Sequence, residues 1–128
     1  MVLRHVALQC CSEKNSDRFY QSLLGLTKLN AKTLPAEIAN TLFHVNSEIP
    51  VVNYGNDELW FEIFIRENKP ADSTPIAHVC LAVADRPSFI EKCRSMEIEI
   101  RQVARGDGVL VIVCDYDGNL FEIKEAQG

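Results

Sequence analysis

The sequence lacks the features that would place it among nucleic-acid-binding or membrane proteins. Its uninterrupted apolar runs are far shorter than the roughly 18 residues that a membrane-spanning helix needs. Positive charge is not in excess, because 13 Lys and Arg stand against 18 Asp and Glu, for a net charge of −5. Phosphate binding requires a basic surface, so the charge balance argues against a nucleic-acid partner, and the short apolar runs argue against a membrane.

A disulfide framework is also missing. The five cysteines are an odd number and none form a CxxC pair. The first ten residues carry Arg4 and His5 and are too few for the apolar region of a signal peptide. We therefore expect free thiols, a reducing compartment and a cytoplasmic location.

The length of 128 residues fits a single domain, 1–128, with a core that needs no staples. The composition, 47% hydrophobic and 24% charged, is that of an ordinary globular protein. A polar, proline-containing stretch predicts a linker at about 67–75. It separates two modules, about 1–66 and 76–128.

The pattern of the first module predicts a strand, a helix and then further strands. The residues that fit one helical face are Phe19, Tyr20, Leu23 and Leu24. Asn15 or Ser16 can cap this helix, and Gly25 can end it in a left-handed conformation. Ala31–Asn40 has a weak pattern and is expected to be loop with at most a short helical turn. The expected strands are Val2–Gln9, Leu26–Leu29, Thr41–Val45, Val51–Tyr54 and Leu59–Ile65.

The second module repeats this order. Asp85 followed by Pro87 predicts the start of a helix, and its apolar residues are Phe89, Ile90, Cys93 and Met96. Turn residues at 106–108 and 115–119 separate strands. The expected strands are Ile76–Val83, Glu97–Val103, Val109–Cys114 and Leu120–Glu125.

Short matches relate the two modules. HVAL begins at His5 and HVCL at His78, while FEI surrounds both Glu62 and Glu122. Each module therefore has a His in its first strand and a Glu in its last. A loop insertion near Ala31–Asn40 would account for the longer spacing in the first module.

These four residues suggest a metal site. Alternation places each on the sheet face opposite its apolar neighbours, and a buried, unpaired carboxylate is unfavourable. A lone strand His or Glu is more often exposed than a ligand, but the symmetric order of all four favours a shared ion. Two imidazoles and two carboxylates suit divalent Ni, Zn, Co, Mn or Fe.

Three further side chains lie outside this set of four. His44 has no counterpart in the second module, and we interpret it as structural or pocket-lining. Trp60 and Phe64 share a strand face with Glu62. They either line the same cavity or pack against a helix of another layer, and both interpretations stay open.

Several stretches carry a family resemblance: LRHVALQ, SDRFYQSLLGL, LWFEIFI, AHVCLAVAD and DYDGNLFEIKE. They resemble the glyoxalase, bleomycin-resistance and extradiol-dioxygenase superfamily, also called vicinal oxygen chelate proteins. The resemblance covers nearly the whole chain and is weakest at Asn30–Pro50. It implies an α+β fold in which two βαβββ modules form a half-open, curved sheet around a metal-binding cavity. It also implies a homodimer.

Within this superfamily the ligand pattern is similar to that of glyoxalase I, or lactoylglutathione lyase. The resemblance implies that His5, Glu62, His78 and Glu122 bind the metal, most often Ni or Zn. It implies that Glu122 is the catalytic base and acid, and that Glu62 shares the proton transfer. The substrate would be a hemithioacetal formed from a thiol, or a related 2-hydroxycarbonyl compound.

Two positions depart from the glyoxalase I pattern. Gln9 stands where an Arg usually contacts the glutathione carboxylate, and Arg66 stands where an Asn is usual. Arg105, in the loop before Val109, could contact an anion instead. The departures put glutathione in doubt more than the metal or the proton transfer. The expected substrate contacts are Gln9, Trp60, Phe64, Arg66 and Arg105.

Other functions of the superfamily remain alternatives. An epimerase of the methylmalonyl-CoA type typically has Gln at the position of Glu62, and a fosfomycin-type thiol transferase more often uses three ligands. An extradiol dioxygenase uses iron bound by two His and one carboxylate, usually in a longer chain. A non-enzymatic protein that sequesters an aromatic drug would lack the ligands, although Trp60 and Phe64 are compatible with it.

Overall fold

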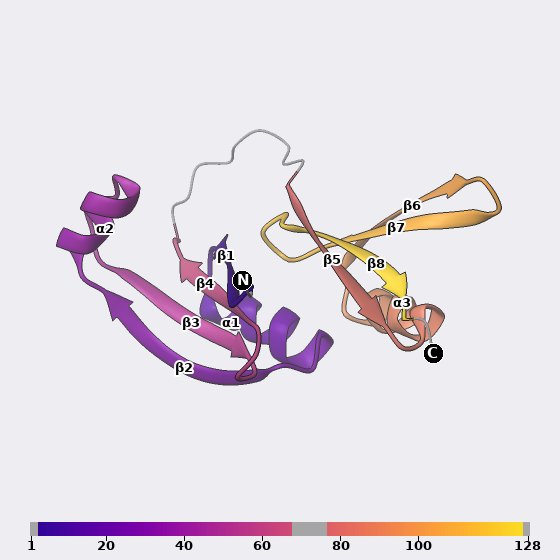
Figure 1. Cartoon of the computed structure of the whole chain (residues 1–128), viewed down its shortest axis with the longest axis horizontal. Helices are drawn as coiled ribbons and strands as arrows, with labels where there is room; N and C mark the ends of the chain where they lie inside the picture. Colours follow the sequence, from indigo (N-terminus) through magenta and orange to yellow (C-terminus); the bar gives the residue numbers. More distant parts are fainter. Residues whose placement is uncertain (1–2, 68–76, 127–128) are drawn as a thin grey trace. The chain divides into compact units, whose positions relative to one another are not determined.

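The computed structural model describes residues 3–67 and 77–126. The chain divides into two compact units, Met1–Pro70 and Ala71–Gly128, and each has its own four-stranded mixed sheet (Figure 1). Both follow the order strand, helix, three strands, which confirms the α+β class and the two βαβββ modules. Most of the linker predicted at 67–75 lies outside the described residues. No helix in the described ranges is long and apolar enough to cross a membrane.

The first unit has the strand order β1-β4-β3-β2. β1 is parallel to β4, and the other neighbours are antiparallel. A short α-helix, α1, continues directly into the π-helical segment η1 between β1 and β2. The elements are β1 (His5–Cys10), α1 (Glu13–Ser16), η1 (Asp17–Leu23), β2 (Thr27–Leu34), α2 (Ala36–Phe43), β3 (Ile49–Gly55) and β4 (Trp60–Ile65).

Aromatic packing fixes η1 to one face of this sheet. The ring of Tyr20 lies 5.4 Å from that of Tyr54 on β3 and 5.6 Å from that of Phe61 on β4, and all three side chains are buried. The Tyr54 hydroxyl donates a 2.7 Å hydrogen bond to Asp17. Burial and this carboxylate raise the pKa of Tyr54, so the hydroxyl stays a donor. η1 does not cover the opposite face of the sheet.

The second unit repeats the arrangement with the order β5-β8-β7-β6 and a parallel β5–β8 pair. Asp85 caps its helix, because the carboxylate accepts a 3.0 Å hydrogen bond from the Ser88 N–H, as predicted. The elements are β5 (His78–Val83), α3 (Arg86–Ser95), β6 (Glu99–Arg105), β7 (Gly108–Cys114) and β8 (Leu120–Glu125). The buried core residues include Cys93, Val111, Val113, Phe121 and Ile123.

The loop predicted at Ala31–Asn40 is wrong, and so is the strand at Thr41–Val45. β2 extends to Leu34, and α2 then runs through the region that was expected to be irregular or extended. Figure 1 shows α2 at one end of the β2 and β3 strands. The helix buries only Ala39, so its pattern gives little indication of a core-facing helix. α2 is the extra element of the first unit. At the equivalent place in the second unit, a tight turn joins β6 to β7.

The predicted cap of the first helix is also wrong. The cap is Ser12, whose hydroxyl accepts from the Asn15 N–H at 3.1 Å, so the helix begins before Asn15 and Ser16. Ser16 is buried, and its hydroxyl donates to the Ser12 carbonyl. Gly25 follows the helix with φ +73°, as predicted.

Candidate functional site

The His and Glu of each unit lie on neighbouring parallel strands in the same register. In the first unit His5 pairs with Trp60, and Ala7 pairs with Glu62. The equivalent pairs in the second unit are His78 with Leu120 and Cys80 with Glu122. In both units the Glu therefore lies two residues beyond the partner of the His. Alternation then places both side chains on one face, so the sequence repeat is also a repeat of strand register.

In the second unit the pair is close. His78 Nε2 lies 3.8 Å from Glu122 Oε2, with side-chain exposures of 44% and 20%. Lys124, two residues further along the same face, places its Nζ 4.0 Å from the other carboxylate oxygen. Glu122 is thus mostly buried and lies between an imidazole and an ammonium group, whereas His78 on the same face is partly exposed.

In the first unit aromatic side chains lie on both sides of the acidic residue. Trp60 and Phe64 share a strand face with Glu62. The ring of His5 stacks on Trp60, with centroids 5.4 Å apart and planes at 28°. Phe64 meets Phe43 of α2 edge-on at 5.5 Å. Phe64 therefore packs against a helix, which is one of the two interpretations left open by the sequence.

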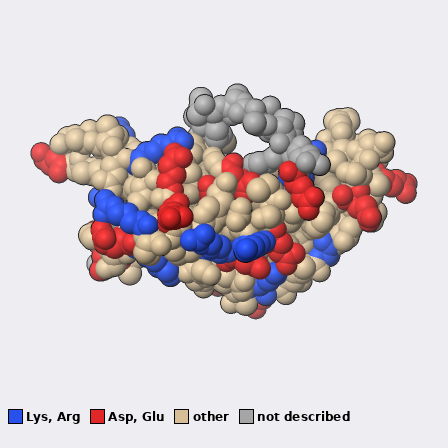
Figure 2. Space-filling view, turned by 180° about the vertical axis from the view of Figure 1, so that it is seen from behind, with Lys and Arg blue, Asp and Glu red and all other residues tan. Residues whose placement is uncertain are grey.

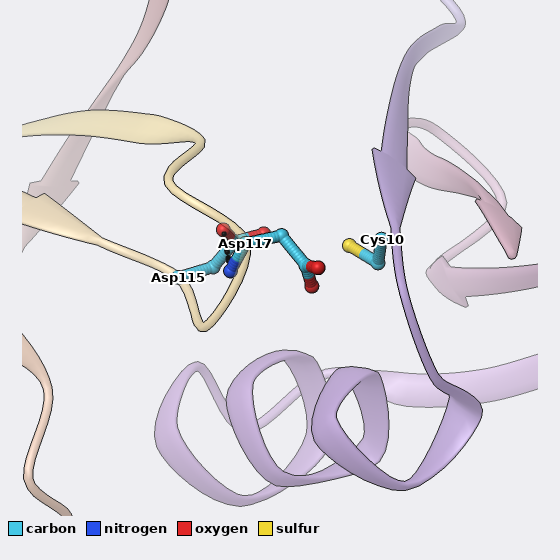
Figure 3. A group of neighbouring side chains, drawn as sticks. All are labelled: Cys10, Asp115 and Asp117. Atoms are coloured by element: carbon cyan, nitrogen blue, oxygen red, sulfur yellow. Dashed lines mark hydrogen bonds between the residues drawn. The ribbon is translucent and has the colours of Figure 1, made fainter. Parts of the chain in front are cut away.

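The turn before each Glu-bearing strand is held by one side chain. Asn56 accepts backbone N–H groups two and three residues further on, at 2.8 and 3.0 Å. In the second unit the buried Asp115 carboxylate accepts the Asp117 N–H at 2.9 Å (Figure 3) and the Asn119 N–H at 2.8 Å. These bonds fix where β4 and β8 begin, and so they fix the positions of the two Glu residues.

The two departures from the glyoxalase I pattern contact each other. Arg66 Nη1 donates a 3.1 Å hydrogen bond to Gln9 Oε1, and the Arg66 backbone N–H donates to the Cys10 carbonyl at 2.8 Å. Arg66 is one of the residues that line an open cavity of about 280 Å³, formed by residues 47–50 and 65–67. A cationic group therefore lies at the end of β4, on the strand that carries Glu62.

Arg105 lies far from Glu122 along the sheet of the second unit, and His44 lies at the end of α2. Arg105 pairs with Gly108 at the β6–β7 turn, whereas Glu122 pairs with Ile112. Four residues along a strand span about 14 Å, so the second unit does not bring Arg105 to Glu122. His44 ends α2 in a left-handed conformation, φ 58°, and is exposed.

The sequence analysis missed Asn53. This β3 residue pairs with Glu62 across the sheet, so the two side chains share a face. It is only 5% exposed, and its Nδ2 donates a 2.9 Å hydrogen bond to Asn30 Oδ1. Its Oδ1 has no hydrogen-bond partner among residues 3–67 and 77–126. The sequence around Asn53 indicates only a strand close to a turn.

Charge is mixed over the surface that Figure 2 shows. Lys and Arg side chains lie between Asp and Glu side chains, and a large part of this face carries neither. This distribution agrees with the modest net charge of −5.

Two βαβββ units that repeat a His and a Glu in one register define a paired-module α+β protein. The family model of the Glyoxalase/Bleomycin resistance protein/Dioxygenase superfamily matches residues 2–123. The chain therefore belongs to this superfamily. A comparison with curated proteins gives no significant match.

Solved structures share the fold at low sequence identity. A glyoxalase family protein from Bacillus cereus has a TM-score of 0.75 and 15% identity, covering 100% of this chain and 95% of that one. The trypanothione-dependent glyoxalase I of Leishmania major has a TM-score of 0.72 and 17% identity, covering 98% and 86%. The third structure is a mutant of the fosfomycin resistance protein FosX from Listeria monocytogenes in complex with Mn(II) and 1S,2S-dihydroxypropylphosphonic acid. It has a TM-score of 0.72 and 14% identity, covering 98% of this chain and 90% of that one.

Proposed function

We propose that this protein is a divalent-metal-dependent lyase or isomerase of the glyoxalase I type. The metal ligands are His5, Glu62, His78 and Glu122, two from each unit. The observation that carries the proposal is the repeated register, which gives each unit one His and one Glu on neighbouring parallel strands. All four side chains lie on the partly exposed face of their sheets and outside the buried core.

The residues fit a divalent ion. His78 Nε2 and Glu122 Oε2 are 3.8 Å apart, and two ligands of one ion with bonds of about 2.1 Å lie roughly 3 to 3.5 Å apart. A small side-chain rotation closes the difference. Two neutral imidazoles and two carboxylates balance a 2+ charge and suit Ni or Zn first, with Co, Mn and Fe as alternatives.

The protein residues would divide the reaction between them. A bound divalent ion supplies Lewis-acid polarisation of the substrate oxygens. Glu122 removes a proton from one carbon of the substrate and returns it to the adjacent carbon. Glu62 shares this proton transfer, and Trp60 and Phe64 exclude water from the carbon atoms.

The substrate class follows from the cationic group at the end of β4. Arg66, held by Gln9, is suited to an anionic group such as the carboxylate of a thiol adduct. This contact replaces the Arg that glyoxalase I usually has at the position of Gln9, so the thiol can differ from glutathione. Arg105 contributes no contact close to Glu122. A homodimer and a cytoplasmic location remain part of the proposal.

The test is turnover of the hemithioacetal of methylglyoxal and glutathione, and of a second thiol, by protein loaded with Ni²⁺ or Zn²⁺. Glu122→Gln should lower kcat by about 10²- to 10⁴-fold, the usual contribution of a general base. The matched control is Glu125→Gln on the same strand, an exposed carboxylate of the opposite parity that should leave kcat unchanged. Equal rates in the two variants would contradict the assignment of Glu122.

The second candidate is a protein that binds a small aromatic molecule without turnover. The aromatic pairs on both sides of Glu62 favour it, since they offer ring-stacking surface. This function predicts tight binding of an aromatic ligand that is insensitive to metal removal. The enzymatic function predicts that removal of the metal abolishes turnover and also abolishes the binding of ligands that coordinate the metal through their oxygen atoms.

A further inference from the structure

Asn53 is the buried polar group that neither the fold nor the proposed chemistry explains. Its side chain is 95% buried on β3, yet Oδ1 has no hydrogen-bond partner in the part of the chain that the structure describes. A buried carbonyl oxygen without a partner is unfavourable, and most such oxygens in folded proteins are paired. Packing alone would be better served by an apolar residue of the same size.

The orientation of Asn53 is fixed by its neighbour. Nδ2 donates to Asn30 Oδ1 at 2.9 Å across the β2–β3 pair. This bond occupies the donor end of the amide and leaves the acceptor end for another group. Asn30 is exposed, so water can serve it if Asn53 is replaced.

The location of Asn53 indicates what the missing partner is. Asn53 and Glu62 are direct cross-strand partners in an antiparallel pair, with Cβ atoms expected about 5 Å apart. Two acceptors, an amide oxygen and a carboxylate, thus lie side by side on the face assigned to the site. They do not satisfy one another, so the group that completes this pair is a hydrogen-bond donor from outside residues 3–67 and 77–126.

We propose that Asn53 is a specificity-determining residue whose Oδ1 accepts a hydrogen bond from a hydroxyl group of the ligand bound beside Glu62. The inference rests on the proposed function for the substrate class, since 2-hydroxycarbonyl compounds carry such a hydroxyl. A neutral amide oxygen selects a donor without demanding charge. Asn53 therefore distinguishes hydroxylated ligands from their deoxy analogues, and it takes no part in the proton transfer.

The test compares mandelate with phenylacetate, two aromatic acids that differ by one hydroxyl and do not require turnover. Binding is measured by calorimetry on the Zn²⁺-loaded full chain. Wild type should bind mandelate more tightly than phenylacetate. Asn53→Leu, which is nearly isosteric, should lose about five- to tenfold of the affinity for mandelate, the contribution of one hydrogen bond, with little change in the affinity for phenylacetate. The control, Asn40→Ala at an exposed position of α2, should keep the preference for mandelate.

Thermal unfolding of the metal-free proteins gives a second, independent readout. Removal of an unpaired acceptor should leave the melting temperature of Asn53→Leu equal to or above that of wild type. If that variant does not fold, Asn53→Ala is used, and it should be no less stable than Asn30→Ala. No preference for mandelate in wild type, the same preference in the Asn53 variants, or greater destabilisation by both Asn53 variants than by Asn30→Ala would each overturn the inference.

The two proposals fail in different ways. If the proposed enzymatic function is wrong, Glu122→Gln and Glu125→Gln should show equal turnover. That result leaves the preference for mandelate and its loss in Asn53→Leu measurable, because neither depends on proton transfer.

Discussion

Gly55 should be the least replaceable glycine of the first unit, because it lets β3 and β4 approach each other beside Trp60. Its φ of +154° is unfavourable for other residues, and a Cβ at this position would lie 2.5 Å from the Trp60 Cα and 2.6 Å from its Cβ. Real Cβ contacts of this length essentially do not occur, so the backbone of β4 would have to move. Movement of Trp60 would also disturb its stacking on His5.

The loss of stability expected for Gly55→Ala can be divided into two parts. A positive φ costs an alanine about 1 to 2 kcal/mol, and overpacking against a fixed backbone adds about 1 to 3 kcal/mol. Gly55→Ala should therefore lower the free energy of unfolding by about 2 to 5 kcal/mol. Gly25→Ala is the matched control, since its φ is +73° but its Cβ would meet nothing within 4 Å, so only the first part applies.

Urea unfolding followed by tryptophan fluorescence measures this difference, because Trp60 is the single tryptophan of the chain and reports on β4 directly. Gly55→Ala should shift the midpoint downwards by about 1 to 2 M. Gly25→Ala should shift it by less than half as much. Equal shifts in the two variants would refute the argument that close approach, and not φ alone, requires Gly55.

Three other consequences can be measured. Burial raises the pKa of the Cys93 thiol to about 11. At pH 8 Cys93 should therefore react with iodoacetamide only after denaturation, whereas the exposed Cys80 should react in the native protein. Mass spectrometry measures both reactions. The hydrogen bonds at the helix cap lower the pKa of Asp85, so its stabilisation is present above the unfolded-state pKa and is lost as the pH falls through the lower folded-state value. Asp85→Asn should therefore reduce the dependence of stability on pH in that acid range. Arg66→Met should raise KM for anionic thiol adducts about tenfold with little change in kcat, while Gln9→Ala should have a smaller effect of the same kind.

The strands were predictable because their residues alternate and their turns carry strong local signals. Asp85 and its following proline identify a helix start, and the turns near residues 106–108 and 115–119 have the expected residues. These signals are local, so no knowledge of the tertiary structure is needed. The HVxL and FEI repeat predicted a His in the first strand and a Glu in the last strand of each unit, but the pairing of these strands was not predicted.

The errors occur where local signals are weak or where a different hydrogen-bond pattern takes over. α2 has no side-chain cap and buries one residue, so neither its start nor its inner face is marked in the sequence. The first helix begins at Glu13 but becomes π-helical from Asp17, which changes the period that a search for α-helical spacing assumes. Phe19, Tyr20 and Leu23 are buried, but Leu24 is not.

The candidate site was predictable in part for a similar reason. His78 and Glu122 stand out because each is a polar residue within an apolar strand, and the structure places them 3.8 Å apart. Asn53 does not stand out, because its significance depends on the β3–β4 register and on a missing hydrogen-bond partner. Neither property can be seen before the strands are paired.

The metal content of the purified protein tests the central claim most directly. Elemental analysis of wild type after incubation with Ni²⁺, Zn²⁺, Co²⁺ or Mn²⁺ and removal of free ions should give about one divalent ion per chain. Glu122→Gln should hold the ion more weakly, and Glu125→Gln should hold it as wild type does. A wild-type protein that retains none of these ions would contradict the assignment of His5, Glu62, His78 and Glu122 as ligands and would leave the binding-protein function in its place.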